Sequence, residues 1–184
     1  MKAEPTFLGY ALLGLLEQNP CSGYDLRKVF ALTPMMAFSD SPGAIYPALR
    51  RLEHGGWIRG WVENRAGLRR RKVFRPTPAG TEALKSWLGR PISRDDVIRG
   101  LDGLMLRFAF LDLVLGKESA VQFLKQLNKE LRSHVPTLRE FLRTRANDMP
   151  LSGRLALESG ILGYEAQLEW TNQALARYRR AGKD

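Results

Sequence analysis

The residues of this sequence best suited to a chemical role are basic, and the chemistry they suggest is the binding of anions. Between positions 59 and 75, seven Lys or Arg side chains accompany a single acid, Glu63. A segment this basic repels itself unless an anion neutralises it, although such a run is often only a solvated loop. A phosphate polymer is therefore the partner we expect. The basic residues are Arg59, Arg65, Arg69, Arg70, Arg71, Lys72 and Arg75.

A second candidate surface lies just before this run, in the segment "SPGAIYPALRRLEHGGW" at positions 41–57. Its apolar residues Ile45, Leu49 and Leu52 recur at helical spacing. Proline is tolerated only near a helix start, so a proline at 47 predicts a helix beginning near residues 42–44, with Ser41 as its N-cap. The free N–H groups of a helix start suit contact with phosphate. The side opposite the apolar residues carries Tyr46, Pro47, Arg50 and Arg51.

Residues that could support catalysis or hold a metal are few. His54 and His134 are the two histidines and Cys21 is the single cysteine, and no spacing resembles a zinc site or a nucleophile elbow. Asp95 and Asp96 are expected to be charges in the first turn of a helix. We therefore expect no enzyme activity, no metal site and no cofactor.

Composition supports a polyanionic partner and argues against a membrane protein. The 29 basic and 19 acidic residues give a net charge of +10. Residues 1–90 hold 14 basic and 7 acidic residues, a surplus of +7, whereas residues 91–184 hold 15 and 12, a surplus of +3. No apolar run approaches the roughly 18 residues that span a bilayer. The lone cysteine fits a reducing compartment, so we expect a cytoplasmic protein without a membrane partner.

The first ninety residues read as helix, helix, helix, hairpin, helix. The segments "WIRGWVEN" and "RKVFRPT" are rich in Trp, Val, Ile and Phe and are joined by a short Gly-containing link, which predicts a β-hairpin. Three helices and a hairpin make a winged helix-turn-helix, in which the third helix enters the major groove of DNA and the hairpin lies along the backbone. Structured RNA and nonspecific DNA remain alternative partners. The expected DNA-binding residues are Ser41, Tyr46, Pro47, Arg50, Arg51, Arg65, Arg69, Arg70, Arg71 and Lys72.

The second half, residues 91–184, reads as helical throughout. We expect helices over 93–115, 118–144 (kinked at Pro136) and 152–178. The last carries a heptad seam, which needs a partner helix from a second copy or from residues 118–144 of the same chain. The predicted fold is therefore mainly α with one β-hairpin: a winged-helix DNA-binding domain over 1–90 and an α-helical dimerisation domain over 91–184. The expected dimerisation residues are Leu157, Ile161, Tyr164, Leu168, Trp170 and Leu175.

Three segments also resemble one family of bacterial transcriptional regulators, the PadR family. They are "LLGLLEQNPCSGYDL", "SPGAIYPALRRLEHGGWI" and "GLRRRKVFRPTPAG". The similarity is strong over residues 7–88, and the second half is similar to the longer members with a helical C-terminal domain. Ala44 stands where the family often has Gln, and Phe74 where it usually has Tyr.

The resemblance implies a homodimer that binds a double-stranded DNA operator through its recognition helix and wing, pairs through its C-terminal helices and usually represses transcription. It also implies release of DNA by a small aromatic or amphipathic effector. Four aromatic residues could line the effector site, although core packing is the more common role for each, so no effector-binding residue is assigned. They are Trp87, Phe108, Tyr164 and Trp170.

Overall fold

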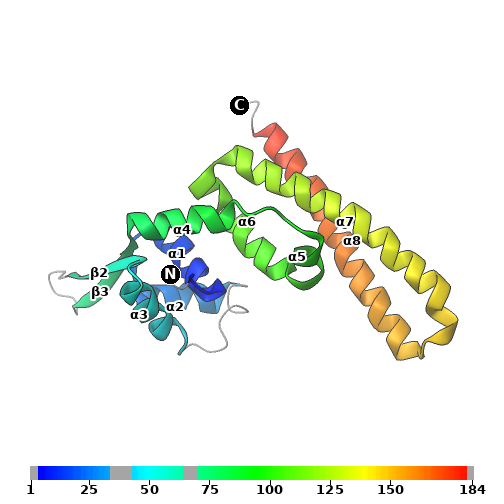
Figure 1. Ribbon diagram of the computed structural model, residues 1–184, viewed down its shortest axis with the longest axis horizontal. Coiled ribbons are helices and arrows are strands. Elements are labelled where there is room, and N and C mark those ends of the chain that lie inside the picture. The colour runs from blue at the N-terminus through cyan, green and yellow to red at the C-terminus, as the bar shows by residue number, and fades with distance from the viewer. Residues whose placement is uncertain (1–3, 34–42, 64–69, 182–184) are drawn as a thin grey trace. The chain divides into compact units, whose positions relative to one another are not determined.

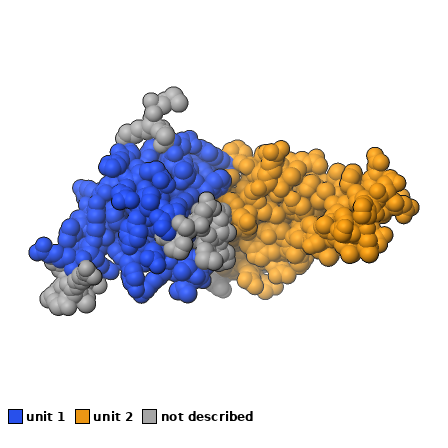
Figure 2. Space-filling model, turned by 90° about the horizontal axis from the view of Figure 1, so that it is seen from below, with its two compact units in different colours: residues 1–90, 109–115 blue, residues 91–108, 116–184 orange. Residues whose placement is uncertain are grey.

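The computed structural model describes residues 4–33, 43–63 and 70–181 of the 184-residue chain. The protein is mainly α-helical with one small antiparallel sheet, as the sequence predicts (Figure 1). It folds as two compact units, residues 1–90 with 109–115 and residues 91–108 with 116–184 (Figure 2). In order, the elements are α1 (Phe7–Gln18), β1 (Cys21–Ser22), α2 (Gly23–Leu32), α3 (Ile45–His54), β2 (Ile58–Glu63), β3 (Arg71–Pro76), α4 (Pro78–Leu88), α5 (Arg94–Arg99), α6 (Leu101–Leu115), α7 (Lys117–Arg145), the 3-10 turn η2 (Ala146–Asp148) and α8 (Leu151–Arg180).

Helix α1 is the centre of the first unit. Its residues 8–16 are all buried, which explains why the segment is apolar on every side. Helix α2 follows with a complete capping box, because the Ser22 side chain accepts from the backbone N–H of Asp25 and Asp25 accepts from that of Ser22. Leu26 and Phe30, one helical turn apart, then bury the inner side of α2 against this core.

The sheet contains the predicted hairpin and one strand that the sequence did not reveal. Strands β2 and β3 pair antiparallel from Ile58 opposite Pro76 to Glu63 opposite Arg71. The two-residue strand β1 pairs with the other edge of β3, with Cys21 opposite Phe74. A strand of two residues carries no periodicity, so only its pairing with β3 identifies it. This pairing joins the start of α2 to the middle of β3.

The predicted single helix over 93–115 was wrong, because Gly100 divides it into α5 and α6. The Gly100 backbone lies at φ −144°, ψ 31°, outside the helical region, and its N–H closes α5 by donating to the Asp96 carbonyl. The end of α6, residues 109–115, belongs to the first unit. There the ring of Phe110 fills the space that a side chain at Gly14 would need, with a ring carbon 2.5 Å from the position of a Cβ.

The second unit is dominated by α7 and α8, which lie side by side (Figure 1). The buried residues of α7 include Leu124, Leu127 and Leu131, and those of α8 are Ile161 and Thr171. Asn128 of α7 donates to the Thr171 hydroxyl at 2.7 Å, so the polar residue of the heptad seam has a partner in the same chain. Of the residues described, none forms a helix long and apolar enough to cross a membrane.

Candidate nucleic-acid interface

Helix α3 is anchored by a continuous buried side and leaves the opposite side open. Pro47 is its third residue, within the first turn, where the missing N–H has little cost. The helix ends before Gly55 and Gly56, and Gly56 has a positive φ of 72° that favours glycine. The buried residues are Ile45, Ala48, Leu49 and Leu52, each at most 3% exposed.

The outward side of α3 follows from its buried side. With about 100° between successive residues, Pro47, Arg50 and His54 lie opposite the core. Tyr46, which is 45% exposed, occupies one flank of this outward side, and the exposed Arg51 occupies the other. An exposed aromatic ring and a guanidinium at i and i+4 form a surface that could contact the edges of bases and the backbone of a duplex.

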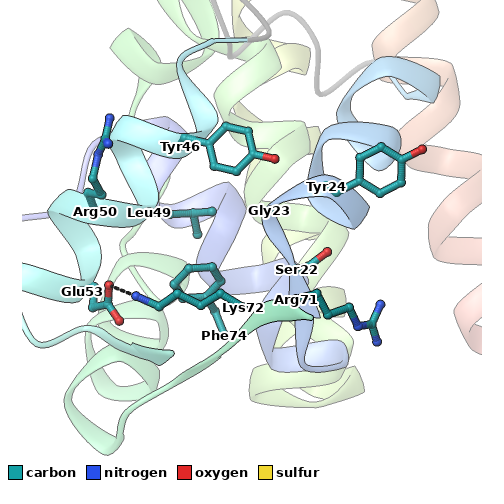
Figure 3. Close-up of a pocket in the computed structure, with 10 residues that line it drawn as sticks. All are labelled: Ser22, Gly23, Tyr24, Tyr46, Leu49, Arg50, Glu53, Arg71, Lys72 and Phe74. Carbon is teal, nitrogen blue, oxygen red and sulfur yellow. Dashed lines mark hydrogen bonds and ion pairs between the residues drawn. The ribbon is translucent and has the colours of Figure 1, made fainter. Parts of the chain in front are cut away.

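A groove of about 400 Å³ runs between this helix and the hairpin (Figure 3). We name it the α3–β3 groove. Figure 3 shows the Tyr46 ring directed across it toward Gly23, while Arg50 and Arg71 point away from its middle. A Cβ at residue 23 would lie 2.7 Å from a Tyr46 ring carbon, so the close approach requires glycine. The groove is lined by Ser22, Gly23, Tyr24, Tyr46, Leu49, Arg50, Glu53, Arg71, Lys72 and Phe74.

Two of the three cations in the groove are paired with acids of the same chain. The Arg71 guanidinium lies 2.8 Å from a Glu63 carboxylate oxygen and 3.2 Å from one of Asp25. The Lys72 ammonium lies 2.7 Å from a Glu53 oxygen. Arg50 makes no ion pair with any residue of the described ranges. The pKa of Asp25 is lowered, first by the backbone hydrogen bond from Ser22 and further by Arg71, so this acid stays ionised.

The basic hairpin is thus less uniform than its sequence indicates. Glu63 is the only acid within the run, but Asp25 and Glu53 reach it from α2 and α3. Arg70 is exposed beside the start of β3. Ser41, Arg65 and Arg69, which were also expected to bind DNA, lie outside the described residues.

Arg51 does not share the groove with Arg50. It lines a separate hollow of about 420 Å³ beside the approach to α1, together with Glu4, His54 and Trp57. The face predicted to hold Tyr46, Pro47, Arg50 and Arg51 is therefore divided between two hollows, with Pro47 half-buried at its centre.

Three exposed residues were not assigned to this surface from the sequence. His54 is exposed on the outward side of α3. Tyr24 of α2 is 58% exposed, with the Lys28 ammonium 4.7 Å from its ring centroid. Its position indicates this exposure, because residue 24 lies about 200° around the helix from the buried Leu26. Trp61 of β2 is 38% exposed and lies beside Arg75.

The residues expected to pair two chains lie along α8, where their present neighbours belong to the same chain. Ile161 is buried, and the other five are half-buried. The Tyr164 hydroxyl donates to the Ile98 carbonyl at 3.3 Å, and Trp170 makes an edge contact with Phe108 at 5.3 Å between ring centroids. The remaining three are Leu157, Leu168 and Leu175.

The remaining candidates from the sequence are the possible metal ligands, the single cysteine and Trp87. No three His, Cys, Asp or Glu side chains among them gather closely enough to hold a metal ion. Burial raises the pKa of Cys21 to about 11, so its thiol is not nucleophilic at neutral pH. Trp87 is a core residue, stacked on Tyr10 with 4.5 Å between ring centroids.

The sequence is similar to known transcriptional regulators. Residues 12–86 match the "Transcriptional regulator PadR-like family". The "Negative transcriptional regulator PadR" of Bacillus subtilis (strain 168) is 30% identical over 122 residues, and the match covers 66% of each chain. The chain thus spans slightly less than two thirds of that relative's length.

Several solved structures are similar as well. Bacillus subtilis PadR in complex with operator DNA is 23% identical, with 94% of this chain and 99% of that chain covered and a TM-score of 0.44. The PadR-like regulator BC1756 from Bacillus cereus is 26% identical, with 97% and 99% covered and a TM-score of 0.44. Members of the matched family are transcriptional regulators and not enzymes. The chain belongs to the PadR-like family of transcriptional regulators.

Proposed function

We propose that this protein is a sequence-specific DNA-binding repressor that acts as a homodimer. The observation that carries the proposal is the outward side of α3, which presents Arg50 without an acidic partner among the described residues, flanked by the exposed Tyr46. An arginine placed in this way can bind guanine with two hydrogen bonds in the major groove. The DNA-binding function is assigned to residues 1–90, which also carry +7 of the net charge of +10.

The hairpin supplies the second part of the proposed interface. Its strands place basic residues beside α3, and contacts of such residues with phosphates are independent of sequence. In this arrangement the basic residues of the β2–β3 hairpin, the wing, position the DNA. The residues of α3 read its bases. The proposed wing contacts are Arg65, Arg69 and Arg70, with Arg71 and Lys72 available once their ion pairs open.

The proposed dimer is supported by the outer side of α8. Between residues 151 and 166 the ten most exposed residues are uncharged, although 26% of the whole chain is charged. Arg154 and Glu158, with side chains 42% exposed, border these residues and pair with each other at 3.7 Å, and Glu165 lines the same hollow as Leu162. Two copies with net charge +10 can approach most closely through an uncharged surface. The exposed residues are Leu151, Ser152, Gly153, Leu155, Ala156, Ser159, Gly160, Leu162, Gly163 and Ala166.

This outer side, which we name the α8 outer face, suits a second copy better than the predicted seam does. The seam residues Ile161 and Thr171 are already buried within the chain. Leu162, by contrast, is 64% exposed, and the exposed glycines around it allow a second helix to come close. Pairing through residues 91–184 would place two recognition helices on two half-sites of a palindromic operator.

The second unit offers a candidate site for a small-molecule effector. A hollow of about 230 Å³ is bordered by Phe108, Trp170 and Tyr178, with Gln173, Ala174 and Arg177 at its edge. Aromatic walls beside a guanidinium suit a small aromatic anion. Binding there would relieve repression if it changed the pairing or position of α8.

The proposal is tested by selecting genomic DNA fragments with the purified full-length protein and sequencing them. We expect recovery of fragments that share a palindromic site, and tight binding of that site in a competition with duplex RNA and with anionic vesicles. Enrichment of fragments with no common sequence, or preference for duplex RNA, would contradict sequence-specific repression. A protein that acts on chromosomal genes in this way would work in the cytoplasm.

A further inference from the structure

We propose that Glu53 weakens the binding of DNA of any sequence by holding Lys72 in an ion pair. This inference rests on the proposed DNA-binding function. Glu53 is an acid in an unexpected place. Glu53 is three residues after Arg50 and lines the same groove, on the flank of α3 that also carries Tyr46. A carboxylate on a surface that approaches phosphates repels them, so its presence there needs an explanation.

Residues of the hairpin determine the path by which the Lys72 side chain reaches Glu53. The Lys72 ammonium lies 5.1 Å from the centroid of the Phe74 ring on its own strand. It then extends past Gly60 of β2 to reach the Glu53 oxygen at 2.7 Å. A Cβ at residue 60 would overlap the end of the Lys72 stem and would lie 2.9 Å from Glu53 Oε1. The missing side chain at residue 60 therefore keeps open the path that joins the two charges. Figure 3 shows the resulting ion pair between Lys72 and Glu53 as a dashed line.

The ion pair between Glu53 and Lys72 lowers the number of positive charges in the groove that are available to DNA. When the pair is closed, Lys72 and Glu53 together contribute no net charge, and Lys72 releases no counterion from DNA. The same holds for Arg71, whose charge is opposed by Asp25 and Glu63. Arg50 then remains the cation of the groove that can bind DNA without first losing an acidic partner. A duplex of any sequence gains the phosphate contact of Lys72 only by opening the pair with Glu53.

The cost of opening the pair is small enough for a correct duplex to overcome. Lys72 and Glu53 are 48% and 31% exposed, and ion pairs with such access to water contribute about 1 kcal/mol or less. An operator that forms base contacts worth several times this energy can open the pair. The cost is the same for a random duplex and for an operator, because both must open the same pair to reach Lys72. Glu53 therefore lowers the affinity for both kinds of duplex.

The test compares two variants that change the net charge equally. Glu53→Gln frees Lys72, whereas Glu82→Gln removes an acid on α4 that does not line the groove. The full-length protein is titrated with a random duplex and with a selected operator at several salt concentrations. For the random duplex we expect E53Q to bind about two- to five-fold more tightly than E82Q. We also expect its log–log salt slope to steepen by about 0.9, the value for one added phosphate contact.

The operator measurement completes the test. We expect the operator affinity of E53Q to rise by a similar factor, so that the ratio of the two affinities stays close to that of E82Q. Equal behaviour of the two variants on random DNA, or weaker binding by E53Q, would overturn the role of Glu53 and leave the proposed function standing. Failure of the parent protein to bind any duplex would instead overturn the proposed function.

Discussion

The ring of Tyr46 occupies the space beside Gly23, and no other residue type fits there without displacing it. A Cβ at residue 23 would lie 2.7 Å from one Tyr46 ring carbon and 3.2 Å from a Leu49 methyl carbon. The start of α2 thus sets the position of a side chain on the outward flank of α3. The Ser-Gly-Tyr segment of the sequence has its physical reason in this contact.

Replacing Gly23 by alanine is therefore expected to disturb α3 more than α2. We expect Gly23→Ala to lower the free energy of unfolding by about 1–3 kcal/mol, the usual cost of an added methyl in a tight site, and to weaken operator binding. Urea unfolding measures the first effect. The double variant G23A/Y46A should recover most of the lost stability, because the ring is no longer there to clash. If it does not, the contact between residues 23 and 46 is not the cause.

Acid is expected to destabilise the protein through His134. This side chain is buried, and burial, together with the nearby Arg94, lowers its pKa below the ordinary value of 6.5. The unfolded chain then binds a proton at a pH where the folded chain does not, so stability is fully present above about 6.5 and falls as the pH drops toward the lowered pKa. Urea unfolding at pH 7.5 and 5.5 should show this loss.

The matched control for that loss is the exposed His54. We expect His134→Gln to reduce the pH dependence of unfolding and His54→Gln to leave it unchanged. A parent protein equally stable at both pH values would show that the buried imidazole does not control acid stability.

A charge introduced on the α8 outer face is expected to prevent the two chains from pairing. Leu162 and Leu113 are 64% and 52% exposed, and only Leu162 belongs to that face. We expect Leu162→Lys to convert a dimer into a monomer in sedimentation velocity, because two unpaired ammonium groups would be buried near the symmetry axis. Leu113→Lys should remain dimeric. A dimeric L162K protein would place the contact elsewhere, and the seam that includes Leu157 and Leu175 would be the next candidate.

Much of the fold was predictable because its signals are local. The capping box of Ser22, the cap at Thr77 followed by Pro78, and the double glycine after His54 each mark a helix boundary through the residue's own chemistry. The hairpin followed from its aromatic and β-branched residues. The helix boundary at Gly100 was not predicted, because one glycine within an apolar helical pattern is usually tolerated.

The pairing of charges in the groove was not predictable from the sequence. Asp25 lies 46 residues before Arg71, and Glu53 lies 19 before Lys72, so only the tertiary structure reveals that they meet. Tyr24 was not assigned to the surface, although its position around α2 places it opposite Leu26. The seam of α8 stays a prediction as a contact between chains, because a seam alone does not state which helix covers it.

The central claim is that Arg50 reads the operator, and the most direct test measures the binding of Arg50→Ala to operator and random duplexes. Arg179→Ala, an exposed arginine of α8, provides the same change of charge outside the groove. We predict that R50A loses about 1–3 kcal/mol of operator binding while its affinity for random DNA changes little more than that of R179A. Equal operator affinity of R50A and R179A would contradict the account.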